Sequence, residues 1–296
     1  MNKRIYILLI ISMLSGSAFG QFVAKDNLST TLFYLQRNEL DSAKKYIDLA
    51  VVDSNLTAQA NTWYYKGFIY KELYKKSEKE NPTSPHRETS IKAFKKMLFM
   101  KNNDPYIEST LNFLKYLAST LYNDAAKMLT PEHYETAINN YNLYSRIIQL
   151  TDKDINIEEK DVEFKLALAS MLSSPNDTIE EITDSTIKHQ VKELYREVLA
   201  IDSNNAASNY NLGIMYYNEG AEIINKMDYN TDLIKLMKTE DYCIEIFSNA
   251  LPYMQKSYEL GYRRKETLIG LQNIYYSLHE KEKSDGYKKE LKELDN

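Results

Sequence analysis

Residues 63–70 read WYYKGFIY, with an aromatic residue, a glycine four positions later and a tyrosine three positions after that. Residues 90–97, SIKAFKKM, follow with a small residue, an aromatic residue four positions on and a methionine three positions further. Both segments have the spacing that places apolar side chains along one face of an α-helix. The stretch around them therefore predicts two successive amphipathic helices.

Both patterns recur along the chain. The first returns as N-x2-L-G-x2-Y at 209–216 and as L-x2-L-Q-x2-Y at 268–275. The second occurs five times, beginning at Ala43, Ser90, Ala137, Val191 and Ala250, which are 47, 47, 54 and 59 positions apart. A long repeat period of this kind indicates an array of supersecondary units. Because one helix pair cannot bury its apolar face alone, neighbouring pairs are expected to stack.

These motifs resemble the tetratricopeptide repeat (TPR), whose first helix carries W-x2-L-G-x2-Y and whose second carries A-x3-F-x2-A. The resemblance implies an all-α, TPR-like α-solenoid of about six antiparallel helix pairs, some with long inserts within a pair. The expected pairs span residues 22–56, 57–105, 106–154, 155–204, 205–261 and 262–296, and the clearest inserts span 75–88, 172–185 and 220–242. Gly67 and Gly213 are expected to let the second helix of their pairs approach closely, since glycine has no Cβ.

The N-terminus has the features of an export signal. Lys3 and Arg4 precede an apolar run at 5–14, and small residues end the segment at Ala18 and Gly20. The run is too short to span a bilayer. We expect residues 1–20 to be a cleaved signal peptide, with a single TPR-like domain at 21–296 in the periplasm or outside the cell. The composition and C-terminal 50 or so residues are similar to exported TPR proteins of Bacteroidetes, a resemblance that implies no particular activity.

Signals for catalysis are weak. The four histidines are scattered without metal-ligand spacing, and no phosphate-binding or nucleophile motif occurs. The single cysteine, Cys243, has acidic neighbours and reads as a buried structural thiol; it allows neither an internal disulfide nor a lipid at the cleavage site. The net charge of −5 without a basic block argues against nucleic-acid binding. We predict a non-enzymatic protein without cofactor or metal, whose partner is a protein or peptide.

In TPR proteins the first helix of each pair lines a concave groove, so the resemblance implies candidate partner-binding positions. They are Asn61, Tyr64, Phe68 and Lys71 in the second pair, Ala207, Tyr210, Ile214 and Tyr217 in the fifth, and Ile269, Asn273 and Tyr276 in the sixth. Tyrosine is a frequent interface anchor. For Tyr64 and Tyr210, packing against an adjacent repeat is equally open at this point, and the inserts form a second candidate surface.

A different class of function stays open as an alternative. Some glycan-uptake proteins of the cell envelope are built on TPR-like helices, and exposed tyrosines stack on sugar rings. The chain has only one tryptophan, Trp63, and that residue occupies a packing position of the repeat, which argues against the carbohydrate-binding alternative.

Overall fold

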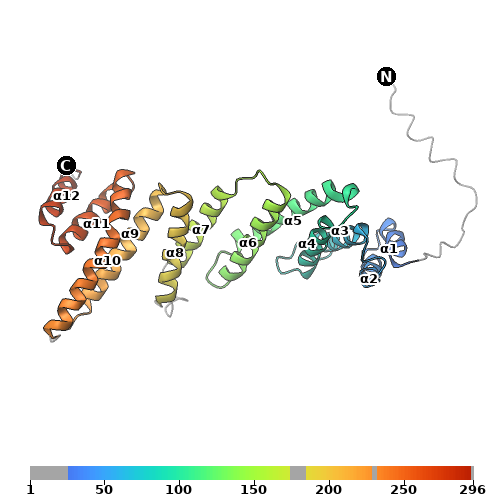
Figure 1. The fold of residues 1–296 in the computed structure, drawn as a ribbon, viewed down its shortest axis with the longest axis horizontal. Helices are drawn as coiled ribbons and strands as arrows, with labels where there is room; N and C mark the ends of the chain where they lie inside the picture. The colour runs from blue at the N-terminus through green and yellow to red at the C-terminus, as the bar shows by residue number, and fades with distance from the viewer. Residues whose placement is uncertain (1–25, 174–184, 229–231, 295–296) are drawn as a thin grey trace, which may run out of the picture. The chain divides into compact units, whose positions relative to one another are not determined.

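The computed structural model describes residues 26–173, 185–228 and 232–294, shown in Figure 1. This part of the chain is all-α, with twelve α-helices, one short 3-10 helix and no β-strand. The helices are α1 (Asn27–Gln36), α2 (Leu40–Ala50), α3 (Ala60–Lys76), α4 (Pro85–Leu98), α5 (Ile107–Lys127), α6 (Tyr134–Thr151), α7 (Glu158–Ser173), α8 (Ser185–Ile201), α9 (Ala206–Asn225), α10 (Leu233–Glu259), α11 (Arg264–Ser277) and α12 (Lys281–Leu294). They fall into six successive pairs, each inside one of the six predicted ranges, so the predicted solenoid-like pairing is confirmed.

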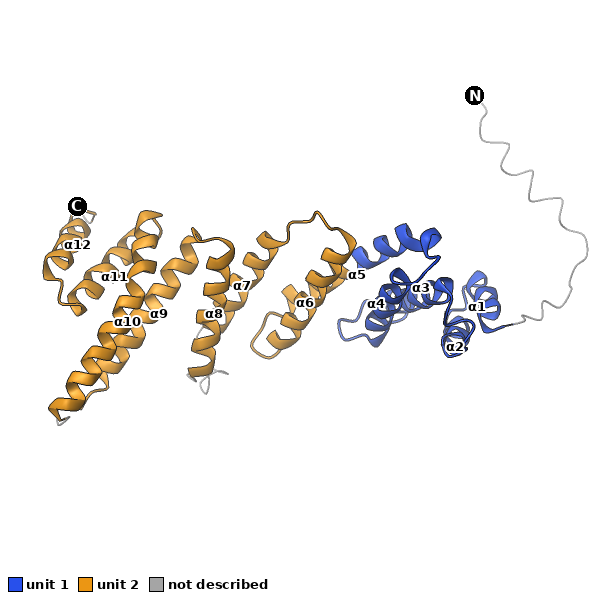
Figure 2. Cartoon of the chain, in the orientation of Figure 1, with its two compact units in different colours: residues 1–117 blue, residues 118–296 orange. Residues whose placement is uncertain are grey.

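The chain divides into two compact units, coloured separately in Figure 2. Unit 1 is Met1–Leu117 and unit 2 is Ala118–Asn296, so α5 crosses the division. The predicted signal peptide at 1–20 and most of the predicted insert at 172–185 lie outside the described residues. No helix in the described ranges combines the length and the apolar character needed to cross a membrane.

The repeated motif of the second helix supplies the core. Its fifteen positions are 43, 47, 50, 90, 94, 97, 137, 141, 144, 191, 195, 198, 250, 254 and 257, and all are buried except Tyr144, which is half-buried. Burying these side chains removes their apolar surface from water, which stabilises the fold by about 25 cal/mol for each Å² of apolar surface buried. The periodicity read from the sequence therefore marks the side of each second helix that packs inward.

The glycines of the first helix lie where the second helix comes closest. A Cβ added to Gly67 would be 2.5 Å from Phe94 Cδ1, and one added to Gly213 would be 2.7 Å from Met254 Cγ. The small residue Ser90 also meets Gly67, because its hydroxyl donates a hydrogen bond to the Gly67 carbonyl at 2.8 Å. The expected close approach is confirmed, and the large residue of the motif is the one that lies over each glycine.

Two of the predicted inserts are partly helical in the structure, because the helices on either side extend into them. At the start of α4, the Ser84 side chain accepts hydrogen bonds from the backbone of His86 and Arg87, and Pro85 occupies the first turn. The predicted insert at 75–88 is thereby reduced to a loop at 77–84. The insert at 220–242 contains the predicted extra helical turns, because α9 continues to Asn225 and α10 begins at Leu233. As a result, α10 has 27 residues and its neighbour α11 has 14.

Candidate functional site

The predicted groove residues of α3 are engaged in packing within unit 1. The ring of Tyr64 lies 4.5 Å from that of Tyr106, and the ring of Phe68 lies 5.8 Å from that of Phe113, measured between centroids. Asn61 is half-buried on the same helix. These aromatic side chains fill the space between the second pair and the start of α5. Their contacts support the interpretation, left open from the sequence, that Tyr64 packs against the next repeat.

Lys71 is buried, with its ammonium group enclosed by aromatic and acidic side chains. Its Nζ lies 4.4 Å from the centroid of Phe113 and 5.0 Å from that of Phe68, and it pairs with the carboxylate of Glu72. Burial raises the pKa of Glu72, but hydrogen bonds from Lys71 and Lys76 outweigh burial and hold that pKa below its ordinary value. The charge of Lys71 is thus satisfied inside the fold.

The predicted groove residues of α9 also pack against other residues, in this case within unit 2. Tyr210 is buried, with its ring 5.8 Å from that of Tyr262. Ile214 and Tyr217 are half-buried against the core of the fifth and sixth pairs, and the Tyr217 ring lies 5.8 Å from that of Phe247. Ala207 is half-buried as well.

The predicted residues of α11 face outward instead. Ile269, Asn273 and Tyr276 occupy positions i, i+4 and i+7, which share one face of a helix. Ile269 is 39% exposed, Asn273 is half-buried and Tyr276 is 72% exposed. Of the three predicted sets, this one leaves the largest aromatic surface in contact with solvent.

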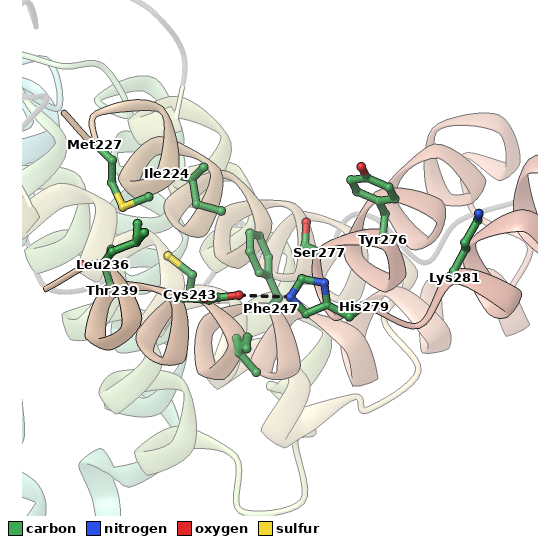
Figure 3. Close-up of a pocket in the computed structure, with 12 residues that line it drawn as sticks. Ile224, Met227, Leu236, Thr239, Cys243, Phe247, Tyr276, Ser277, His279 and Lys281 are labelled. Atoms are coloured by element: carbon green, nitrogen blue, oxygen red, sulfur yellow. Dashed lines mark hydrogen bonds and ion pairs between the residues drawn. The ribbon is translucent and has the colours of Figure 1, made fainter. Parts of the chain in front are cut away.

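Tyr276 lines a pocket of about 510 Å³, which we call the α10 pocket. The end of α9 and the first half of α10 supply its apolar wall, which consists of Ile224, Met227, Leu236, Cys243, Ile244 and Phe247. Figure 3 shows Ile224, Met227, Leu236 and Cys243 gathered at one end of this pocket and Tyr276 with Lys281 at the other. The volume lies in the range of about 300–1,000 Å³ that is typical of binding pockets.

Polar groups surround the mouth of the α10 pocket. His279 Nε2 lies 3.3 Å from Glu240 Oε1, drawn as a dashed line in Figure 3, and both side chains are largely exposed. Exposed pairs of this kind contribute little stability. Lys281 and the hydroxyls of Thr239 and Ser277 complete the polar mouth. An apolar wall with a few polar groups at the entrance is the arrangement expected for holding an apolar side chain whose polar neighbours stay in water.

Cys243 is part of the apolar wall. Its side chain is buried, and its thiol lies 3.8 Å from the Gly220 carbonyl oxygen. Burial raises the pKa of this thiol, so it is protonated at neutral pH and a poor nucleophile. This geometry agrees with the interpretation of Cys243 as a structural thiol.

A row of apolar side chains beside the pocket is exposed. Leu233, Ile234 and Met237 of α10 are 70%, 69% and 57% exposed. These residues lie in the predicted insert at 220–242, for which no apolar surface was predicted. The signal was the run LIKLM at 233–237, in which every residue except Lys235 is apolar. Contiguous exposed apolar surface of this kind marks interaction sites on folded proteins.

Two other pockets lie in unit 2, and their charged groups are largely paired with each other. One, of about 470 Å³, lies among α6, α7 and α8, where Lys165 pairs with Glu197 at 3.0 Å. The other, of about 640 Å³, lies between α8 and α9, where Lys188 pairs with Glu222 at 3.0 Å. Within the described ranges, no group of three or more His, Cys, Asp or Glu side chains is placed to hold a metal ion. The α10 pocket is therefore the candidate that joins a cavity to exposed apolar surface.

No protein-family profile matches the chain, and no curated protein matches it either.

Proposed function

We propose that this chain is a non-catalytic helical-repeat scaffold of the TPR type, which binds a partner protein by holding an apolar side chain of the partner in the α10 pocket. The observation that carries the proposal is the combination of the pocket with adjacent exposed apolar side chains. Tyr276, at 72% exposure, stands at the mouth as a rigid aromatic anchor. A helix or extended peptide lying along α11 would contact the face formed by Ile269, Asn273 and Tyr276.

The other elements of the proposal come from the sequence. The N-terminal segment favours export, so the partner would be met in the periplasm or outside the cell. The repeat motifs favour a TPR-type scaffold, in which specificity comes from shape and aromatic contacts. The predominance of apolar side chains in the pocket favours an apolar peptide side chain over a sugar, whose hydroxyls need hydrogen-bonding partners.

The first test is site-specific crosslinking. A photoreactive amino acid is placed at position 276 of the full chain, and a matched one at Lys92, which is 73% exposed on α4. We expect position 276 to capture one protein partner and position 92 to capture none. The captured segment is then mapped by mass spectrometry and synthesised as a peptide.

The second test measures the affinity of that peptide. We expect Tyr276→Ala to weaken binding about tenfold or more, as loss of an anchor residue does. Tyr242→Ala is the control, because Tyr242 is 51% exposed on α10 but does not line the pocket; its effect is expected to stay within about twofold. Equal effects of the two substitutions would contradict the proposed site. A glycan that binds the wild type and is lost in Tyr276→Ala would overturn the peptide proposal in favour of carbohydrate binding.

A further inference from the structure

The first half of α10 has a second face that the α10 pocket does not use. At about 1.5 Å per residue, α10 is about 40 Å long and α11 about 21 Å, so residues 233–245 extend beyond α11. We call residues 233–245 the α10 arm. Its inner face carries Cys243, which packs toward α9. Its opposite face is solvent-exposed.

The exposed face of the α10 arm forms a regular stripe. Ile234, Lys238, Asp241 and Glu245 follow each other at i, i+4, i+7 and i+11, and all four are exposed. At about 100° per residue they lie within about 60° of one another, on the side opposite Cys243. Met237 and Tyr242 flank the stripe. These six residues are the outer stripe.

The charges of the arm are segregated along its length. Lys235 and Lys238 lie toward the start of the helix, whereas Glu240, Asp241 and Glu245 follow. Within the described ranges, none of Lys238, Asp241 and Glu245 has an ion-pair partner inside 4.0 Å. The outer stripe thus carries both signs of charge, and neither is ion-paired with another of the described residues.

A helix with this pattern is complementary to a second copy of itself in the antiparallel orientation. In the register that faces Lys238 with Asp241, Met237 faces Tyr242 and the Glu245 stem covers Ile234. A two-fold axis repeats each of these contacts. A parallel arrangement would oppose like charges, which is unfavourable. We propose that two copies of this chain associate through their α10 arms, antiparallel and in this register.

The size of the stripe sets the expected strength of this association. A stripe about 20 Å long and about 10 Å wide buries on the order of 400 Å² in total, far below the ~1,200 Å² of a standard stable interface. The dimer is therefore expected to be weak and transient. None of the six residues of the outer stripe lines the α10 pocket, but Ile234 and Met237 also belong to the exposed apolar row beside it, so the dimer would cover part of that row. The two proposals are distinguished by their tests, because sedimentation of the free chain needs no partner peptide.

The experiment is reciprocal charge reversal, followed by sedimentation velocity of the full chain from about 10 µM to about 1 mM at low salt, where screening is weakest. Two variants are made, Lys235→Glu/Lys238→Glu and Asp241→Lys/Glu245→Lys. We expect the wild type to dimerise with rising concentration, each variant alone to stay monomeric, and an equimolar mixture of the two variants to associate again. Circular dichroism confirms that the variants fold.

A control reverses charges elsewhere in unit 2. Lys288→Glu/Lys289→Glu changes two exposed lysines of α12 by the same amount and is expected to dimerise as the wild type does. The proposal is overturned if the wild type stays monomeric throughout, or if the two arm variants dimerise as the wild type does. It is also overturned if the wild type is monomeric and instead binds anionic phospholipid vesicles through the arm, because the outer stripe would then be a membrane contact.

Discussion

Gly67→Ala tests the helix pairing at the point where two helices of unit 1 come closest. The added Cβ would lie 2.5, 2.6 and 2.8 Å from Cδ1, Cε1 and Cγ of Phe94. Carbon atoms in ordinary contact are about 3.5–4.0 Å apart, so the ring would have to move by about 1 Å. Phe94 is fully buried, and its centroid lies 5.5 Å from that of Phe113 and 6.3 Å from that of Tyr64, so it has little room to move.

The magnitude follows from two opposing contributions. Overpacking at such a site costs about 2–3 kcal/mol, and replacing glycine by alanine inside a helix returns about 1 kcal/mol. We expect Gly67→Ala to lower the free energy of unfolding of unit 1 by about 1–2 kcal/mol. The single tryptophan, Trp63, lies four residues before Gly67 on α3, so its fluorescence during urea unfolding reports this unit.

The matched control is the same substitution at Gly286 in α12. A Cβ at Gly286 would have no neighbouring atom within 4 Å. Gly286→Ala is therefore expected to stabilise the chain by about 0.5–1 kcal/mol through helix propensity alone, measured by circular dichroism. In the Gly67→Ala background, Phe94→Leu should recover part of the lost stability by making room. A Gly67→Ala chain as stable as the wild type would refute the close packing of α3 on α4.

Three further predictions concern other parts of the fold. Gly213→Leu should lower the free energy of unfolding of unit 2 by about 3 kcal/mol or more, because its Cβ would lie 2.7 Å from Met254 Cγ and 3.2 Å from the Met254 backbone nitrogen. An unchanged melting curve would contradict this prediction. Burial raises the pKa of Asp48, but hydrogen bonds from Tyr70 and two lysines outweigh burial and lower this pKa below its ordinary value of 3.8. The ionised Asp48 carboxylate therefore stabilises the fold above pH 3.8, and this stabilisation is lost as the pH falls through the lower folded-state pKa. Asp48→Asn should therefore be less stable than the wild type at pH 7, with a difference that shrinks in acid, as urea unfolding at several pH values would show. Cys243 should react with a neutral thiol reagent far more slowly in the folded chain than in urea, because its thiol is buried and its pKa is raised; equal rates would contradict its burial.

The repeat motifs predicted the packing of the pairs well, because they depend on local periodicity. The spacing of Ala43, Ile47 and Ala50 fixes one face of a helix, and that face is buried in the structure. The glycine positions were also predictable, since only the lack of a Cβ lets a ring such as that of Phe94 lie so close. In the sixth pair, Gln272 stands at the glycine position and its carbonyl accepts a hydrogen bond from Ser284 at 2.9 Å, the same contact that Ser90 makes with Gly67.

The candidate site was harder to predict because it depends on differences in length between neighbouring helices. The pocket exists where α10 extends beyond α11, and the end of α11 at Ser277 is not encoded by one distinctive residue. The groove positions taken from the family resemblance share one helix face, yet Tyr210 is buried and Tyr276 is exposed. What covers each position is decided by the neighbouring pair. Tyr210 meets Tyr262, whereas beside Tyr276 the fold leaves a pocket.

Occupation of the α10 pocket is the central claim, and Cys243 is a built-in probe for it because it is the only thiol of the chain and lines the pocket wall. The decisive measurement is the rate of Cys243 alkylation by a small neutral reagent, with and without the partner peptide captured from position 276. We predict that a saturating peptide slows alkylation of the wild type about tenfold or more, and that far more peptide is needed for the same protection in Tyr276→Ala. An alkylation rate that does not change at saturating peptide would contradict the claim that the partner enters this pocket.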